Sequence, residues 1–228
     1  MVSQLQLWQN MSKIKAVIFD FDGVIAESVN LKTEAFSEIY RSYGNEIVEK
    51  VVKHHETNGG ISRYEKFKFY HENFLKESID ENKILELSNT FTELVIQKVI
   101  DAPYVPGAHE YILSRFQKYD LFISTGTPTE EINIILKARN LSQYFRDVFG
   151  APEKKEMHVK TILSRNNYSP DQVLFIGDSV NDRDASRMNH ITFIGRYTTD
   201  KDIKHEKYLF NNFSELDLII ESLNSEQS

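Results

Sequence analysis

Short, continuous runs of apolar residues, each ending in a small or acidic residue, constrain the fold of this chain more than any other feature. These runs are KAVIF at 15–19, LFIS at 121–124, VLFI at 173–176 and ITFI at 191–194. Polar and apolar residues do not alternate in them, which is typical of parallel strands buried on both faces. Between them, segments such as 132–136 and 159–163 have helical periodicity. The alternation predicts an α/β fold with right-handed crossovers and a doubly wound, Rossmann-like parallel sheet.

The stretch from about 32 to 103 lacks comparable strand runs and is rich in Glu, Lys, Phe and Tyr. Its pattern predicts about four helices, near 32–43, 46–55, 62–77 and 80–99. Pro103, Pro106 and Gly107 mark the return of the chain to the sheet. The expected division is a core at 13–31 and 104–228, an inserted four-helix domain at 32–103 and an N-terminal tail at 1–12. The alternative is a single domain with extra helices.

Composition narrows the class of partner. The 228-residue chain has a formal net charge of -7, which argues against a nucleic-acid or anionic-membrane partner. It has no cysteine, so disulfides and thiolate metal sites are excluded. No apolar run approaches the length of a membrane span, and MVSQLQLWQNMSK at the start does not resemble a signal peptide. We expect a soluble, cytoplasmic monomer or weak dimer without nucleic-acid or membrane partners.

Two acidic motifs follow strand runs, at the edge of a parallel sheet where ligands bind. Asp20 and Asp22 lie in DFDGV, where one carboxylate could attack phosphorus and the other could handle a proton. Asp178 and Asp182 lie in GDSVND and could share one face as a helix begins. Clustered carboxylates repel each other, so a divalent cation is their natural counter-charge, and oxygen-only ligands suit Mg²⁺. The alternatives are a turn in which Asp caps backbone amides and an acidic helix N-terminus.

A hydroxyl-rich motif, STGTPTE, follows the second run. Thr127 and Glu130 form a capping-box pattern, and Pro128 falls at the first helical position, so we expect a helix to begin there. The free amides of that helix and the hydroxyl of Thr125 could hold phosphate oxygens, unless these residues only cap the helix.

Two lysines follow GAP at 150–152. Either Lys154 or Lys155 could neutralise a phosphate and hold Asp20 ionised, although a single lysine is more often a solvated surface group.

In order and spacing, these motifs resemble the haloacid dehalogenase superfamily. The resemblance is to the branch of phosphoglycolate phosphatases, sugar-phosphate phosphatases and mutases that carry a helical cap after the first strand. It covers nearly the whole chain from Lys13 onward. It implies a Mg²⁺-dependent phosphatase for a small-molecule phosphate ester, such as a sugar phosphate or phosphoglycolate, with an aspartyl-phosphate intermediate.

The resemblance also implies roles for matching residues. Asp20 would be the nucleophile and Asp22 the general acid and base. Thr125, Gly126 and Lys155 would bind the phosphate, with Lys154 the weaker candidate for the basic residue, and Ser124 should point to the opposite face. The implied metal ligands are Asp20, Asp22 (through its carbonyl), Asp178 and Asp182, the last either as a ligand or as a support for one.

The expected cap carries one candidate for substrate binding. GGISR at 59–63 resembles a cap loop that faces the active site in this branch, so Arg63 could grip an anionic or hydroxylated part of the substrate. The alternative is an arginine that braces the cap helix.

Three other functions compete with a phosphatase. A dehalogenase does not use an acid at the position of Asp22. The hexose-phosphate mutases carry a Thr and then a His soon after the opening motif, where this chain has Ser28 and Lys32, so a mutase ranks second. A non-catalytic binding protein would have no evident use for the intact aspartates.

Overall fold

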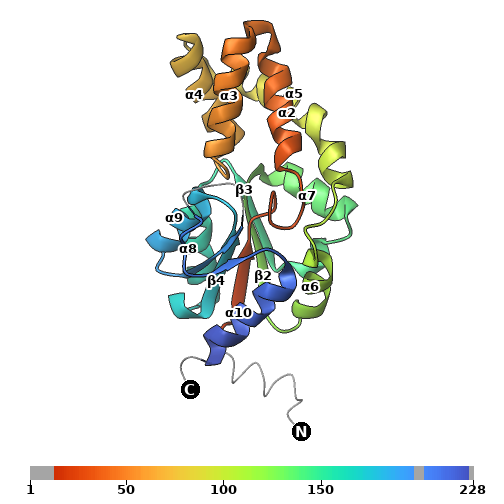
Figure 1. Ribbon diagram of the computed structural model, residues 1–228, viewed down its shortest axis with the longest axis vertical. Coiled ribbons are helices and arrows are strands. Elements are labelled where there is room, and N and C mark those ends of the chain that lie inside the picture. Colours follow the sequence, from red (N-terminus) through yellow and green to blue (C-terminus); the bar gives the residue numbers. More distant parts are fainter. Residues whose placement is uncertain (1–12, 198–202, 226–228) are drawn as a thin grey trace.

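A parallel sheet lies at the centre of the structure, as the sequence predicts (Figure 1). It has six strands, two more than the four predicted apolar runs. The structure is a computed structural model that describes residues 13–197 and 203–225, so the predicted tail at 1–12 lies outside the described residues. The strand order is β3-β2-β1-β4-β5-β6. The strands are β1 (Ala16–Phe19), β2 (Asp120–Pro128), β3 (Asp147–Ala151), β4 (Val173–Gly177), β5 (Thr192–Arg196) and β6 (Leu209–Phe210). The order reverses at β1, and such a switch point is where open parallel sheets bind ligands.

Helices cover both faces of the sheet, which explains why the strand runs are continuously apolar. Val17 and Phe19 belong to one buried cluster, and Ala16 and Ile18 belong to a second. In Figure 1, α6 and α10 lie on one side of the sheet, and α8 and α9 lie on the other. The helices of the sheet region are α6 (Ala108–Arg115), α7 (Thr129–Ala138), α8 (Lys155–Asn166), α9 (Val180–Met188) and α10 (Phe213–Ser225).

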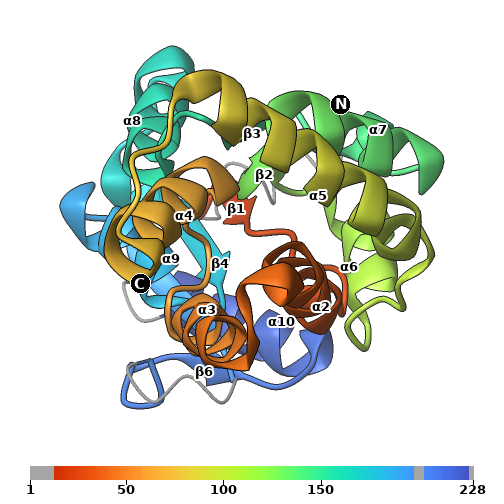
Figure 2. The ribbon, with the colours of Figure 1, turned by 90° about the horizontal axis from the view of Figure 1, so that it is seen from above.

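The chain between β1 and β2 forms a group of helices over the carboxyl end of the sheet (Figure 2). They are α2 (Val29–Tyr40), α3 (Asn45–Thr57), α4 (Arg63–Tyr70) and α5 (Glu81–Asp101). An aromatic cluster holds them together, since the Phe36 ring centroid lies 4.6 Å from that of Phe91 and 5.5 Å from that of Phe67. The predicted helices correspond to these four, although α2 begins at Val29 and α4 continues as a π-helical turn at His71–Leu75.

The two connections between the sheet and these helices lie side by side. Glu27 donates its amide to the Pro103 carbonyl at 2.9 Å, and Val105 donates to the Ile25 carbonyl at 3.0 Å. Buried apolar residues of the sheet and of the helical insert form one continuous cluster, and the division into domains stays a prediction. Among the described residues, no helix is both long and apolar enough to cross a membrane.

Candidate active site

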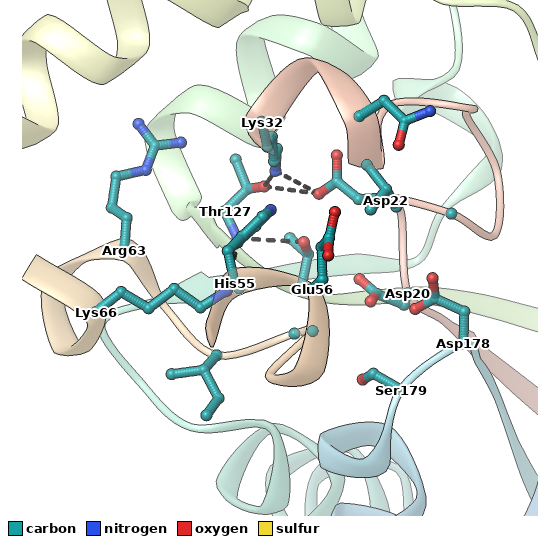
Figure 3. A pocket seen from close by; sticks show the side chains of 18 of the residues that line it. Asp20, Asp22, Lys32, His55, Glu56, Arg63, Lys66, Thr127, Asp178 and Ser179 are labelled. Carbon is teal, nitrogen blue, oxygen red and sulfur yellow. Dashed lines mark hydrogen bonds and ion pairs between the residues drawn. The ribbon is translucent and has the colours of Figure 1, made fainter. Parts of the chain in front are cut away.

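A cavity of about 360 Å³ lies between the carboxyl end of the sheet and the helical insert (Figure 3). The sheet contributes Asp20, Asp22, Thr125, Gly126 and Asp178 to its lining, among others. The insert contributes Lys32, Phe36, His55, Glu56, Gly59, Gly60, Ile61, Arg63, Lys66 and Phe91. The parallel register places these sheet residues together, because Phe19 pairs with Ile123 of β2 and with Ile176 of β4. The residues that follow each strand therefore meet at one edge.

Asp20 lies at the floor of this cavity with only 3% of its surface exposed. Its Oδ2 forms an ion pair with Lys155 Nζ at 2.8 Å, and its Oδ1 accepts the amide of Phe21 at 2.6 Å. Burial raises the pKa of Asp20 to about 7; the charge of Lys155 opposes this rise, whereas Asp182 and Asp22 add to it. An ionised Asp20 therefore depends on nearby positive charge.

Lys155 supplies part of that charge. It is the first residue of α8, is 2% exposed and also contacts Asp182 Oδ1 at 2.6 Å. Burial alone would lower the pKa of Lys155, but Asp182 and Asp20 outweigh burial and raise that pKa above its usual value. Lys154 caps the same helix and is exposed, so the structure brings Lys155 rather than Lys154 to the carboxylates.

Three of the predicted metal ligands lie together. Carboxylate oxygens of Asp20, Asp178 and Asp182 all lie within 4.8 Å of one another. Burial, followed by the charges of Asp20 and Asp182, raises the pKa of Asp178 well above its usual value. Gly23 leaves room for this cluster, because a Cβ there would lie 2.1 Å from Asp178 Oδ2. An oxygen-rich cluster of mutually repelling carboxylates, two of them buried, fits a hard divalent metal ion.

Asp182 has a supporting role in this cluster as well. Its Oδ2 accepts hydrogen bonds from the Ser179 hydroxyl at 2.6 Å and from the Ser179 and Asp178 amides at 3.1 and 3.2 Å. Its Oδ1 faces Lys155. These contacts fix the loop that carries Asp178, and the role of Asp182 as a metal ligand or as a support for one stays a prediction.

Asp22 has a different environment from Asp20. Its Oδ1 accepts the Ser28 hydroxyl at 2.6 Å, and its Oδ2 accepts Lys32 Nζ at 2.5 Å and the Thr127 hydroxyl at 3.1 Å. Burial acts to raise the pKa of Asp22, but the charge of Lys32 and these hydrogen bonds outweigh burial and lower that pKa. The surroundings of these two neighbouring aspartates therefore shift their pKa values in opposite directions, upward for Asp20 and downward for Asp22.

Lys32 is a site residue that sequence reasoning missed. In the sequence, Lys32 only marks a departure from the mutase pattern, whereas in the structure its Nζ donates to the Thr127 hydroxyl at 2.7 Å in addition to Asp22. It lies in the first turn of α2, which begins soon after the DFDGV motif and so starts directly above the end of β1. The short distance in sequence between the DFDGV motif and Lys32 was the one signal that could have indicated this position.

The hydroxyl-rich motif follows the predictions only in part. Thr125 is buried beside the cavity, and its Oγ1 accepts the Thr127 amide at 3.2 Å. Ser124 points to the other face, as predicted, where its hydroxyl lies 2.9 Å from His158 Nδ1. The capping prediction for Thr127 is wrong, because α7 begins at Thr129 after an extended Pro128 and has no side-chain cap. The Thr127 hydroxyl contacts Asp22 and Lys32 instead.

A glycine loop of the insert closes over these residues. The Gly60 carbonyl accepts the Asn181 side-chain amide at 2.8 Å. A Cβ on Gly60 would lie 3.0 Å from Lys155 Nζ, and a Cβ on Gly126 would lie 2.7 Å from the Gly60 oxygen. Such close approach leaves no space for side chains, so the glycines allow the insert to seal one side of the cavity.

Arg63 lines the cavity, but its guanidinium already has protein partners. Its Nη2 forms an ion pair with Glu131 Oε1 at 2.6 Å, and both side chains are 4% exposed. Its Nη1 donates to the Thr92 hydroxyl at 2.8 Å, and that hydroxyl donates to Glu131 Oε2 at 2.6 Å. Because Glu131 belongs to α7, the cluster ties the insert to the sheet region. The contacts match the bracing alternative, and substrate binding by Arg63 stays a prediction.

We expect Arg63→Met to destabilise the protein by about 3–5 kcal/mol, because it leaves the Glu131 carboxylate buried without its counter-charge. Urea unfolding followed by circular dichroism measures this loss. The double variant Arg63→Met/Glu131→Met is the matched control and should recover part of the stability, since it removes both buried charges. A single variant with wild-type stability would show that the ion pair does not hold the insert in place.

Comparison with known proteins places these observations in a family. The model of the haloacid dehalogenase-like hydrolases matches residues 17–196. A phosphorylated carbohydrates phosphatase from Thermotoga maritima is 29% identical over 189 residues, covering 76% of this chain and 81% of that protein. A phosphoglycolate phosphatase from Vibrio cholerae is 26% identical over 189 residues, covering 75% and 79%.

Solved structures share the fold at lower identity. A β-phosphoglucomutase from Clostridium difficile superimposes with a TM-score of 0.75 at 18% identity, covering 93% of this chain and 98% of that one. A predicted phosphatase from Clostridium acetobutylicum gives a TM-score of 0.72 at 19% identity, covering 92% and 99%. At this identity the likeness concerns the fold alone, and it confirms the α/β architecture.

Proposed function

Because this chain belongs to the haloacid dehalogenase-like hydrolases, we propose that it is a Mg²⁺-dependent phosphatase that hydrolyses a small phosphorylated metabolite. The observation that carries the proposal is the contrast between Asp20 and Asp22. Asp20 belongs to the acidic cluster and pairs with Lys155, whereas Asp22 is held outside that cluster by hydrogen-bond donors. Lys155 and a bound metal ion would hold Asp20 ionised for attack on phosphorus. The donors around Asp22 lower its pKa, so in this proposal Asp22 takes up the proton that it donates only in the substrate complex.

The proposed reaction has two steps. In the first, an Asp20 oxygen attacks phosphorus, the ester P–O bond breaks, and Asp22 gives its proton to the departing oxygen. In the second, Asp22 takes a proton from water, the water oxygen attacks phosphorus, and the aspartyl-phosphate P–O bond breaks to release inorganic phosphate and the Asp20 carboxylate. Lys155, the Thr125 hydroxyl and the Gly126 amide would hold the phosphoryl oxygens.

The metal set in this proposal is the carboxylates of Asp20 and Asp178, with the Asp22 carbonyl, and Asp182 as a ligand or support. When bound, Mg²⁺ would offset the charge of these carboxylates and of the phosphoryl group. The names of the two curated relatives support a phosphate monoester as substrate. The cytoplasmic location and the monomeric or weakly dimeric state remain predictions.

Hydrolysis and transfer are separated by one experiment. Inorganic phosphate release is measured across a panel of sugar phosphates, phosphoglycolate and nucleotides, with and without Mg²⁺. A phosphatase releases phosphate from at least one member only when Mg²⁺ is present. A mutase would instead convert one sugar phosphate into its isomer with little release, and this outcome would favour the second candidate.

We expect Asp178→Ala to raise the Mg²⁺ concentration for half-maximal activity by roughly tenfold or more, since even residues outside the ligand set change metal affinity by ~10–100-fold. Thermal unfolding across a Mg²⁺ titration should show the same shift without relying on turnover. Asp184→Ala is the matched control, because Asp184 is an exposed aspartate on α9, the helix that follows Asp178. Full wild-type activity after exhaustive chelation would remove the metal from the proposal.

A further inference from the structure

The basic side chains that line the cavity differ in whether a carboxylate of the protein pairs with them. Three of them pair with a carboxylate within 2.6 Å: Lys32 with Asp22, Arg63 with Glu131, and Arg196 with Glu27. Lys66 lines the same cavity, and among the described residues no carboxylate lies within ion-pair distance of its Nζ. Glu56 also lines the cavity, but it is exposed and forms no ion pair with Lys66. Among the described residues that line the cavity, Lys66 is therefore a cation without a carboxylate partner.

Lys66 is nevertheless fixed in place. It lies on α4 with 2% of its surface exposed, and its Nζ is 2.8 Å from His55 Nδ1. Burial, then the charges of Lys32 and Lys155, lowers the pKa of Lys66 to about 7. A buried ammonium group in this setting gains from any anion placed beside it.

His55 completes a site made only of donors. Burial and the charge of Lys66 lower the pKa of His55 far below its usual value, so its ring is neutral. With Nδ1 accepting from Lys66, the ring proton sits on Nε2, and Nε2 is buried without a hydrogen-bond partner. Leaving a buried donor unsatisfied is unfavourable, and because His55 lines the cavity, an acceptor atom of a ligand could satisfy it.

We infer that Lys66 and His55 form a subsite for a second anionic group of the substrate, a carboxylate or a further phosphate, remote from the reacting phosphoryl group. The inference rests on the proposed function and narrows its substrate class. Figure 3 shows Lys66 and His55 across the cavity from Asp20 and Asp178, so one ligand can reach both ends. The rings of Phe36 and Phe91 also line the cavity, and an apolar wall strengthens a charged contact.

The test uses matched substrate pairs that differ in one anionic group. Phosphoglycolate is compared with ethyl phosphate for the carboxylate, and fructose 1,6-bisphosphate with fructose 6-phosphate for the second phosphate. The readout is the ratio of kcat/KM within each pair for the wild type, Lys66→Met and Lys66→Arg. Lys68→Met is the control, because Lys68 lies on the same helix with a side chain 62% exposed.

The wild type should prefer the anionic member of one pair, and Lys66→Met should reduce that ratio by roughly 10–200-fold, the range that a charged hydrogen bond provides. Lys66→Arg should restore part of the ratio, and Lys68→Met should leave it unchanged. The pair that responds identifies the anion. An unchanged ratio in Lys66→Met, or a wild type without preference in either pair, would overturn the subsite.

Failure of the subsite and failure of the proposed function give different results. A wild type that hydrolyses an aryl phosphate but shows no preference within the pairs is a phosphatase without this subsite. A wild type without phosphatase activity contradicts the proposed function, and calorimetric binding of phosphoglycolate and ethyl phosphate then tests the subsite directly. Binding also decides the matter if Lys66→Met does not fold, because equal wild-type affinities for both ligands would overturn the inference.

Discussion

Asp20→Asn should reduce turnover by ~10³-fold or more, as expected when a covalent nucleophile is removed. An amide has nearly the same shape as a carboxylate but is a very poor nucleophile. Its oxygen can still accept the Phe21 amide that Asp20 Oδ1 accepts at 2.6 Å, so the loop should keep its conformation. Phosphate release is the primary measurement. Trapping of a phosphorylated protein by rapid acid quench should succeed with the wild type and fail with this variant.

A control separates chemistry from folding in that experiment. Asp171→Asn makes the same change at an exposed carboxylate just before β4, at the opposite end of the sheet from the cavity. It should keep wild-type turnover, and both variants should melt near the wild-type temperature. Residual activity of Asp20→Asn above a few per cent would contradict covalent catalysis by Asp20.

The sheet could be predicted because its signal is local. Val17 and Ile18 are neighbours that face opposite buried layers, and only a strand covered on both sides requires both to be apolar. The strand ends then had to meet at one edge, so the proximity of Asp20 and Asp178 also followed from sequence. The same reasoning predicted a lysine near them but could not choose between Lys154 and Lys155, since that choice depends on how α8 begins.

Helix boundaries were harder to predict because hydroxyl side chains have several possible partners. Ser28 and Thr127 both precede helices, and their positions match those of capping residues. In the structure neither caps its helix, and both hydroxyls donate to Asp22. Sequence patterns describe the local alternative but not the carboxylate that competes with it.

The sequence placed the loop at 59–63 near the site, but it could not identify which residues the insert contacts. The partner of Arg63 is Glu131, 68 residues further along the chain, and nothing in GGISR points to α7. Lys66 and His55 lie on different helices, and each alone matches an ordinary surface residue in sequence. Their proximity results from how α3 and α4 pack under the aromatic cluster, which is a property of the tertiary structure.

Asp22→Asn should lower kcat by ~10²–10⁴-fold, the usual contribution of a general acid or base. The contacts of Asp22 indicate why this role is separable from metal binding. Its carboxylate faces Lys32, Ser28 and Thr127 and lies outside the acidic cluster, so the amide should leave the Mg²⁺ requirement unchanged.

A comparison of substrates with different leaving groups tests whether Asp22 acts as a general acid. An alkyl alkoxide needs a proton as the P–O bond breaks, whereas an aryl oxide departs without one. In the phosphorylation step, measured by the burst of alcohol or phenol, Asp22→Asn should therefore slow an alkyl phosphate far more than an aryl phosphate. Dephosphorylation is common to both substrates and should slow equally, because it needs Asp22 as a base. Equal losses in the phosphorylation step would mean that Asp22 only organises Lys32 and Thr127 around the reacting group.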